Sequence, residues 1–342
     1  MKKKILILLL IPILILGITG CNKKEAKEKD KPIKKEETRV KKNNYVSYNG
    51  KLKIKGVDVV NQYDEKVLLQ GISTHGIQWF GDLYTKDNIA KLKDEFNINL
   101  FRIAMYTDEG GYISDHSIKN KVEEIVEYCK ELDLYVIIDW HILHDNNPNI
   151  NKEEAKSFFK EMSNKYKDYD NVIFEICNEP NGNTTWDDVK NYANEVIPII
   201  RNNTDNIIIV GTPTWSQDVD KAADNPLKFD NITYALHFYS GTHKEELRNK
   251  IDYARDKGIS VFVSEFGVSD ASGNGGVFLD EGKTWLNYLK SKNISYVNWS
   301  FANKDESSAL LLPNTTTPDD NNLSASGKFI KDMYKRGEWL WK

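Results

Sequence analysis

The chain has 342 residues, and its content of 40% hydrophobic and 29% charged residues is typical of a soluble globular protein. Residues 1–44 carry 13 Lys/Arg and five Asp/Glu, a net charge of +8, whereas residues 45–342 carry 34 basic and 46 acidic residues, a net charge of −12. An acidic main domain argues against nucleic acid as a partner, and three cysteines in so long a chain do not indicate a disulfide framework.

The start of the chain has the pattern of a targeting signal. Three lysines precede a nearly unbroken apolar run at residues 5–18, which at about 14 residues is short for a membrane span but typical of a signal-peptide core. The run ends in Gly17-Ile18-Thr19-Gly20-Cys21, which resembles the bacterial lipoprotein signal, in which the Cys is lipidated and becomes the new N-terminus.

We therefore predict a signal peptide at 1–20, lipidation of Cys21, and a position on the extracellular face of the cell membrane. An uncleaved anchor helix and ordinary secretion are the alternatives. Residues 21–44 are rich in Lys and Glu and lack aromatics, so they cannot bury enough apolar surface to fold and should form a disordered tether. Its lysines either approach lipid headgroups or belong to a solvated spacer.

From residue 45 onward, short apolar or β-branched runs alternate with stretches of 3.6-residue periodicity. The predicted strands are 69–73, 99–104, 135–140, 172–177, 207–211, 233–237, 261–265 and 295–300. The predicted helices include 87–96, 118–132, 152–166, 186–201, 244–257 and 281–291. This alternation predicts an α/β fold with a parallel sheet, and eight strands predict a (β/α)8 TIM barrel in a single domain, 45–342.

Two segments do not follow this alternation of strands and helices. Residues 48–68 predict a short N-terminal β-hairpin that closes the bottom of the barrel. Residues 212–232, with Pro213 and Pro226, look loop-rich, so one helix there is expected to be degenerate. A doubly wound open sheet is the alternative fold, but no Gly-rich phosphate turn follows the first strand.

Polar residues collect at the C-terminal ends of the predicted strands, where the active sites of such barrels lie. They are His75, Arg102, His141, Asn178, Glu179, His237, Tyr239, Glu265 and Trp299. Because most of them follow directly on an apolar run, core packing does not explain their recurrence at one end.

Glu179 and Glu265 come at the ends of the fourth and seventh predicted strands, so they should face each other across the barrel mouth. Glycoside hydrolysis needs one carboxyl as proton donor and one as nucleophile or base, and their separation decides the stereochemistry. Taken singly, each could be a loop carboxylate or a helix-cap partner. Glu175 lies inside the fourth strand, where we predict a structural hydrogen-bonding role.

Other readings of these residues stay open at this point. His141 and His144 are spaced like a metal-binding pair, but no Cys or carboxylate is spaced to complete a site, so we predict no metal and no cofactor. Arg102 could simply pair with a carboxylate at the barrel end, and Trp299 could be a core aromatic.

The same residues resemble glycoside hydrolase family 5, in the retaining clan built on (β/α)8 barrels. Asn178-Glu179-Pro180 resembles the acid/base motif of that clan, and Ser264-Glu265-Phe266-Gly267 resembles its nucleophile motif. Blocks at 71–80, 101–106, 137–143, 235–239 and 298–300 resemble the bacterial endo-β-1,4-glucanase (cellulase) branch. The resemblance spans about 45–334; Phe266, where many relatives carry Trp, and Phe301 depart from it.

The resemblance implies a role for each matching residue. Glu179 would be the acid/base and Glu265 the nucleophile. Arg102 would hydrogen-bond Glu265, His237 and Tyr239 would orient the two glutamates, Asn178 would bind the sugar 2-hydroxyl, and His141 would contact the sugar at the cleavage point. Trp299 would stack under that sugar. The glycone subsite would comprise His75, Trp79, Tyr106, Ala271, Lys304 and Glu306, and Trp215 would serve the aglycone side.

The implied activity is that of a retaining endo-β-1,4-glucanase whose partner is a β-glucan polysaccharide such as cellulose. A mannanase, a xyloglucanase and a mixed-linkage glucanase on the same scaffold are the enzymatic alternatives. A non-catalytic glycan-binding surface lipoprotein is the other, although binding alone needs no acid/base pair. We expect a monomer held at the membrane through its N-terminal lipid.

Overall fold

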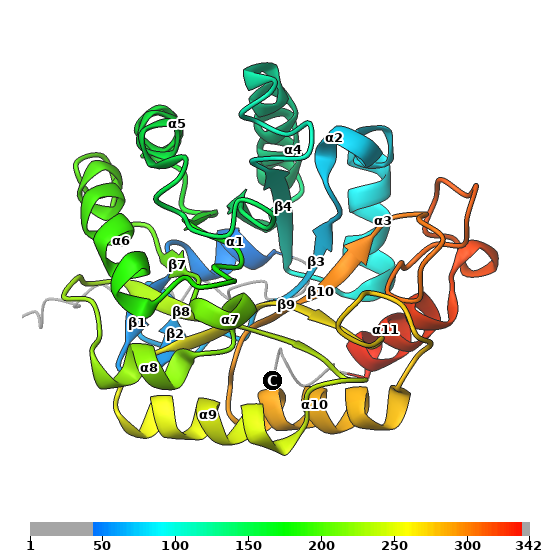
Figure 1. The fold of residues 1–342 in the computed structure, drawn as a ribbon. Coiled ribbons are helices and arrows are strands. Elements are labelled where there is room, and N and C mark those ends of the chain that lie inside the picture. Colours follow the sequence, from blue (N-terminus) through cyan, green and yellow to red (C-terminus); the bar gives the residue numbers. More distant parts are fainter. Residues whose placement is uncertain (1–43, 337–342) are drawn as a thin grey trace, which may run out of the picture. The chain divides into compact units, whose positions relative to one another are not determined.

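The computed structural model of the protein describes residues 44–336, and eight parallel strands form a closed barrel there (Figure 1). The strands are β3 Gln70–Thr74, β4 Leu100–Tyr106, β5 Tyr135–His141, β6 Val172–Glu175, β7 Ile208–Val210, β8 Ile232–Tyr239, β9 Val261–Gly267 and β10 Tyr296–Phe301. Each strand pairs with the next along the chain, and β10 pairs with β3 to close the ring. The predicted (β/α)8 barrel is therefore confirmed.

The barrel strands are buried along their whole length. Parallel strands have helices on one face and the barrel interior on the other, so they are rich in Val, Ile and Leu without polar alternation. β4 and β5 follow this rule except for three buried polar side chains, Arg102, Asp139 and His141. These exceptions all belong to the site described below.

The helices that follow the strands lie around the outside of the barrel (Figure 1). The longer ones are α3 Lys86–Phe96, α4 Lys119–Glu131, α5 Lys152–Lys165, α6 Trp186–Arg201, α9 Glu245–Asp256, α10 Leu279–Ser291 and α11 Ala325–Lys335. In α6, Val189, Ala193 and Ile197 recur on one face and are fully buried. Thr185 and Asp188 form a capping box at its start, a feature that stabilises a helix by about 1 kcal/mol.

Short helices and strands form the two segments, 48–68 and 212–232, that do not follow the strand–helix alternation. The predicted hairpin is formed by β1 Lys53–Lys55 and β2 Asp58–Val60, which pair antiparallel. The loop-rich link after β7 contains only the short helices α7 Pro213–Ser216 and α8 Val219–Asp224, as expected of a degenerate helix. Neither α11 nor the short α1, Tyr45–Asn49, was among the predicted helices; α1 overlaps the start of the predicted hairpin segment.

The hairpin segment lies against the N-terminal ends of the barrel strands. The backbone N–H of Ile54 donates to Asn231 Oδ1 just before β8 (2.6 Å), and the Tyr135 hydroxyl at the start of β5 donates to the Gly50 carbonyl (2.6 Å). The bottom of the barrel is therefore covered, as predicted, and the C-terminal mouth is left for a binding site.

The predicted signal peptide (1–20), Cys21 and the tether as far as residue 43 lie outside the described residues. Within residues 44–336, no helix combines the length and the apolarity that a membrane span requires.

Candidate active site

Glu179 and Glu265 lie close together at the C-terminal mouth of the barrel. Glu179 follows β6 and Glu265 lies within β9, the fourth and seventh barrel strands. A carboxylate oxygen of each lies within 4.8 Å of one from the other. Carboxyl groups about 5–5.5 Å apart suit a retaining mechanism, whereas an inverting one needs about 6.5–9.5 Å to admit a water molecule. The spacing therefore favours retention.

Glu265 receives a hydrogen bond on each carboxylate oxygen. The Arg102 guanidinium donates to Oε2 (3.1 Å) and the Tyr239 hydroxyl donates to Oε1 (2.8 Å). Donors on both oxygens fix the direction of the carboxylate and are placed to stabilise its negative charge. Glu265 thus has the surroundings of a nucleophile, and the predicted contacts of Arg102 and Tyr239 are both present.

A register shift turns two consecutive residues of β9 toward the barrel interior. Ala235 and His237 of β8 pair with Phe262 and Glu265, so β9 has one more residue than β8 between these two pairs. Successive side chains of a regular strand point to opposite faces, and an extra residue breaks this alternation. As a result, Ser264 contacts His237 while Glu265 contacts Arg102.

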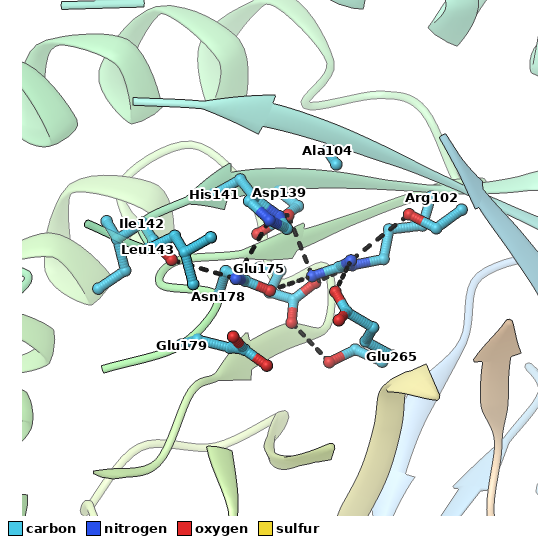
Figure 2. A network of polar contacts seen from close by, with 12 residues as sticks. Arg102, Ala104, Asp139, His141, Ile142, Leu143, Glu175, Asn178, Glu179 and Glu265 are labelled. Atoms are coloured by element: carbon cyan, nitrogen blue, oxygen red, sulfur yellow. Dashed lines mark hydrogen bonds and ion pairs between the residues drawn. The ribbon is translucent and has the colours of Figure 1, made fainter. Parts of the chain in front are cut away.

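Arg102 lies under the two glutamates and is fully buried. Its guanidinium donates to Glu175 Oε2 (2.7 Å) and Asn178 Oδ1 (2.7 Å) and pairs with Asp139 Oδ2 (3.0 Å), besides its bond with Glu265 (Figure 2). The planar fork of an arginine suits such a divergent set of acceptors. Burial opposes its charge, but the surrounding carboxylates outweigh burial and raise the pKa of Arg102.

The two carboxylates beneath the catalytic pair are kept in different states. Glu175 is fully buried, but the Arg102 charge and contacts with His237 outweigh burial and lower its pKa to about 2. Asp139 is also fully buried, and burial raises its pKa well above the ordinary range although Arg102 opposes this. Glu175 therefore stays ionised, and the structure gives it the hydrogen-bonding position predicted for it.

Glu179 has fewer hydrogen-bond partners than Glu265. It is 8% exposed, and among residues 44–336 its carboxylate has one hydrogen-bond partner, His237 Nδ1 (2.9 Å). Burial raises its pKa, the bond with His237 lowers it, and the nearby Glu265 raises it again, with a net upward shift. A carboxyl group with a raised pKa is suited to proton donation, so the surroundings separate the roles of the two glutamates.

His141 and Asn178 are held from within the protein. His141 Nδ1 lies 2.6 Å from Asp139 Oδ2, and burial together with Arg102 lowers its pKa to about 3, so the ring is neutral. The Asn178 amide accepts from Arg102 and donates to the Ile142 carbonyl (3.1 Å), while its Nδ2 lies 3.3 Å from His141 Nε2. A hydrogen bond from Asn178 to a sugar hydroxyl stays a prediction, because the Asn178 amide already bonds to Arg102 and Ile142 and would have to bind the sugar in addition.

The described residues contain one trio of side chains close enough to hold a metal ion, namely Glu179, His237 and Glu265. Both oxygens of Glu265 already have donors, Arg102 and Tyr239, which a cation would have to displace. The arrangement therefore suits acid/base and nucleophilic chemistry better than metal binding. His141 and His144 do not form a pair, since His144 contacts Glu109 instead (3.3 Å).

A cleft of about 620 Å³ opens over the two glutamates. All eight residues predicted to bind substrate line it, together with both glutamates, His141, His237 and Tyr239. These eight are His75, Trp79, Tyr106, Trp215, Ala271, Trp299, Lys304 and Glu306. Arg102 and Asn178 are not in the lining, because both lie buried beneath it.

The walls of the cleft expose flat aromatic surfaces. The Trp79 and Trp215 side chains are 47% and 45% exposed, whereas Trp299 is 6% exposed and stacks on His141. At one end, Lys304 Nζ donates to Glu306 Oε2 (2.6 Å) and lies 3.5 Å from His75 Nε2. Burial and the Lys304 charge lower the pKa of His75 to about 3, so its ring is neutral, with one nitrogen as donor and the other, Nδ1, accepting from the Gly76 N–H (2.7 Å).

The sequence predictions missed several residues that shape the site. Asp139 and Ser264 lie under it, and a charged residue inside the apolar run 135–140 was an available signal for Asp139. The cleft lining also includes residues that were not predicted to bind substrate: Glu109, Leu143, His144, Gln217, His243, Ser272 and Gly273. Most of these lie in loops after the strands, where no periodicity marks which side chain faces the cleft.

The chain is similar to known proteins along most of its length. Residues 60–305 match the family described as Cellulase (glycosyl hydrolase family 5). It is 53% identical over 291 residues to an endoglucanase of Clostridium saccharobutylicum and 54% identical over 277 residues to endoglucanase A of Evansella cellulosilytica. These alignments cover 83% and 79% of this chain but 65% and 57% of those proteins, so the chain spans less than two thirds of either relative.

Solved structures show the same similarity in three dimensions. A cellulase named Cel5C_n is 47% identical with a TM-score of 0.82, covering 84% of this chain and 93% of that one. A catalytic-domain variant of the Thermobifida fusca endoglucanase Cel5A, solved in complex with cellotetraose, is 32% identical with a TM-score of 0.82. That alignment covers 85% of this chain and 99% of the other. Motifs, barrel and family match agree: the chain belongs to glycosyl hydrolase family 5.

Proposed function

We propose that this protein is a retaining endo-β-1,4-glucanase that hydrolyses internal bonds of cellulose or a related β-glucan. The observation that carries the proposal is the pair of glutamates within 4.8 Å of each other, one with two donors and one with a raised pKa. The endoglucanases and cellulases to which the chain is similar support the choice of substrate.

In the first step, a Glu265 oxygen attacks the anomeric carbon while the bond to the leaving glycosidic oxygen breaks. Glu179 donates its proton to that oxygen, so the leaving chain departs as an alcohol. Arg102 and Tyr239 hold the attacking carboxylate in place. The products are a covalent glycosyl–Glu265 ester and a shortened glucan.

In the second step, water attacks the same carbon and the ester bond to Glu265 breaks. Glu179, now a carboxylate, accepts the proton of the water molecule, which restores the starting state. Two inversions at one carbon give net retention. Trp299 lies beside His141 at the edge of the catalytic pair, where a sugar ring can stack on it.

The substrate is tested by comparing hydrolysis rates on carboxymethylcellulose, mannan, xyloglucan and mixed-linkage glucan. The highest kcat/KM is expected on the β-1,4-glucan, with mixed product lengths from defined cello-oligosaccharides. Preference for mannan or xyloglucan would overturn the substrate, and binding without hydrolysis would indicate a glycan-binding protein.

The stereochemistry is tested separately. NMR of the products in the first minutes of hydrolysis should show the β-anomer before mutarotation. Initial formation of the α-anomer would contradict the double displacement.

We also propose that the protein is exported and anchored at the extracellular face of the membrane through a lipid on Cys21. The support is the charged start, the apolar run 5–18 and the small residues before Cys21. Cells given labelled fatty acid should label the wild-type protein and not Cys21→Ala, which should leave the membrane fraction. Equal labelling of both would refute the anchor.

We propose that the enzyme is a monomer, because the cleft and the catalytic pair are formed by one chain. Light scattering of the purified protein without its first 43 residues should give the mass of one chain. A dimer mass at micromolar concentration would overturn this.

A further inference from the structure

The link between β7 and α8 contains three consecutive non-glycine residues with a left-handed backbone. Thr214, Trp215 and Ser216 have φ angles of 57°, 53° and 54°, so the segment labelled α7 is a left-handed turn rather than a regular right-handed helix. Residues with a Cβ rarely adopt this conformation, and a β-branched residue such as Thr214 is a clear outlier there. Such a backbone persists only where its surroundings hold it, and it is commonest at functional sites.

The inner side of this turn bonds to the backbone of the acid/base segment, residues 178–180. The Ser216 hydroxyl donates to the Asn178 carbonyl (2.7 Å). The Trp215 backbone N–H donates to the Pro180 carbonyl (3.0 Å). The turn therefore bonds to the carbonyl before the proposed acid and to the carbonyl after it.

Glu179 lies between these two bonded carbonyls. Its own carbonyl accepts from the Asn181 amide (2.9 Å), so every carbonyl of the acid/base segment has a fixed donor. Where the link leaves β7, a Cβ on Gly211 would come within 2.1 Å of the Cys177 carbonyl oxygen and 3.0 Å of the Asn178 one. Only glycine allows this close approach, which brings the two segments together.

The outer side of the turn is held by charged groups of two helices. The Thr214 hydroxyl donates to Asp218 Oδ2 (2.9 Å). The same buried carboxylate pairs with Lys221 of α8 and with Lys250 of α9, the latter at 2.8 Å. The turn is thus fixed on both sides, as its left-handed backbone requires.

The direction of the Ser216 hydroxyl follows from its two partners. It accepts from the Thr212 backbone N–H (3.2 Å), and the Asn178 carbonyl can only accept, so the single hydroxyl hydrogen is directed to Asn178. Ser216 is fully buried, so bulk water does not replace this donor. Removal of the hydroxyl would leave a buried carbonyl next to Glu179 without that hydrogen bond.

We propose that the left-handed turn positions Glu179 for proton transfer, with Ser216 as a positioning residue. The turn that holds the acid/base segment also presents the Trp215 ring, almost half exposed, to the cleft. A leaving sugar that stacks on this ring is thereby held at a fixed position relative to the proton donor. The inference rests on the proposed function, because it concerns the acid of that reaction.

Ser216→Ala tests the proposal by removing the hydroxyl alone. The kcat/KM for cellopentaose should fall about 10-fold or more, mainly through kcat, because a displaced acid protonates the leaving oxygen less well. The kcat/KM for β-cellobiosyl fluoride should change less than about twofold, because fluoride leaves with little proton donation. A merely structural defect would lower both values alike.

Three further variants separate the hydroxyl from other effects. Ser216→Gly lacks the same hydroxyl but suits a φ of 54°, so it should fold and show the same selective loss. Trp215→Ala keeps the backbone N–H that bonds to Pro180, so it should change kcat less than about twofold. Ser260→Ala is the matched control and should leave both values unchanged, since Ser260 is a buried serine bonded to Thr233 at the opposite end of β8 and β9.

A measurement without substrate follows the bond between the turn and the acid/base segment. Hydrogen exchange of the Trp215 backbone amide is followed by ¹⁵N NMR, with its signal assigned from the one lost in Trp215→Ala. In wild type this amide should be strongly protected, because it bonds to the Pro180 carbonyl. In Ser216→Ala it should exchange on the order of 10-fold faster, because the turn is held less firmly.

An unprotected Trp215 amide in wild type would overturn the proposal, whether or not any variant folds. Equal losses on cellopentaose and on the fluoride, or unimpaired hydrolysis of cellopentaose by a folded Ser216→Gly enzyme, would also overturn it. If wild type hydrolysed no glucan, the proposed function would fail, while the exchange rates would still decide whether the turn holds the segment that carries Glu179.

Discussion

The floor of the active site and the walls of its cleft differ in burial and in bonding. On the floor, Arg102 and Glu175 are fully buried, and each bonds to several partners of fixed position. On the walls, Trp79 and Trp215 expose almost half of their side chains and present ring faces rather than polar groups. From this difference we expect the floor to control the chemical step and the walls to control the affinity for the proposed glucan substrate.

Removal of the nucleophile, which belongs to the floor, should have the largest effect on the rate of hydrolysis. Glu265→Gln keeps the shape of the side chain but cannot form the covalent ester, so kcat should fall on the order of 10⁴-fold or more. Calorimetric binding of cellotetraose should stay within a few fold of wild type because the walls are untouched. Equal hydrolysis by wild type and variant would show that Glu265 is not the nucleophile.

Removal of the acid should have a smaller effect that depends on the leaving group. Glu179→Gln should lower kcat on cello-oligosaccharides roughly 10²–10⁴-fold, and much less on aryl cellobiosides, whose phenol leaving groups need little protonation.

The pH profile of wild type gives a second check on Glu179. Its pKa is raised by burial, so activity should persist above the ordinary range of a Glu and be lost as pH rises through that pKa. Glu179→Gln should lack this alkaline limb. An unchanged limb in the variant would assign the titration to another group.

Arg102→Met measures how much the folded state depends on the floor. It removes the cation shared by Asp139, Glu175 and Glu265, and breaking a buried ion pair in this way costs about 3–5 kcal/mol. Urea denaturation should show this loss. Arg336→Met is the matched control: its pair with Asp332 is 64% and 60% exposed, and its loss should change stability by less than about 0.5 kcal/mol. Equal losses of stability in the two variants would show that the buried ion pairs of the floor contribute no more than an exposed pair.

Truncation of a wall aromatic should have the smallest effect and should appear in KM. Trp215→Ala removes an exposed ring face, so KM for cellopentaose should rise about 3–10-fold with kcat changed less than about twofold. Tyr253→Ala is the control, because Tyr253 is similarly exposed (40%) but lies on α9, outside the cleft. A large fall in kcat with unchanged KM would place Trp215 in the chemical step instead.

Much of the architecture could be predicted from local pattern. The eight strands were located to within a few residues because buried parallel strands are continuous apolar runs. Polar side chains were also correctly predicted at one mouth of the barrel, because the carboxyl ends of all parallel strands meet there. The helix α11 was missed because it follows the last barrel strand, whereas helices were expected between strands. Asp139 was missed although its charge inside the apolar run 135–140 was a signal.

The sequence by itself determined the strand order, the placement of Glu179 and Glu265 on the fourth and seventh strands, and eight other residues that line the cleft, but not the seven further lining residues in the loops. The tertiary structure decided that Glu179 has one hydrogen-bond partner and Glu265 two donors, and it made neighbours of Arg102, Asp139 and Glu175 across three strands. It also decided that Ser264 and Glu265 face the same side, through one extra residue in β9. Apolar periodicity is a local property of a chain, whereas burial, charge neighbours and register exist only once distant strands are paired.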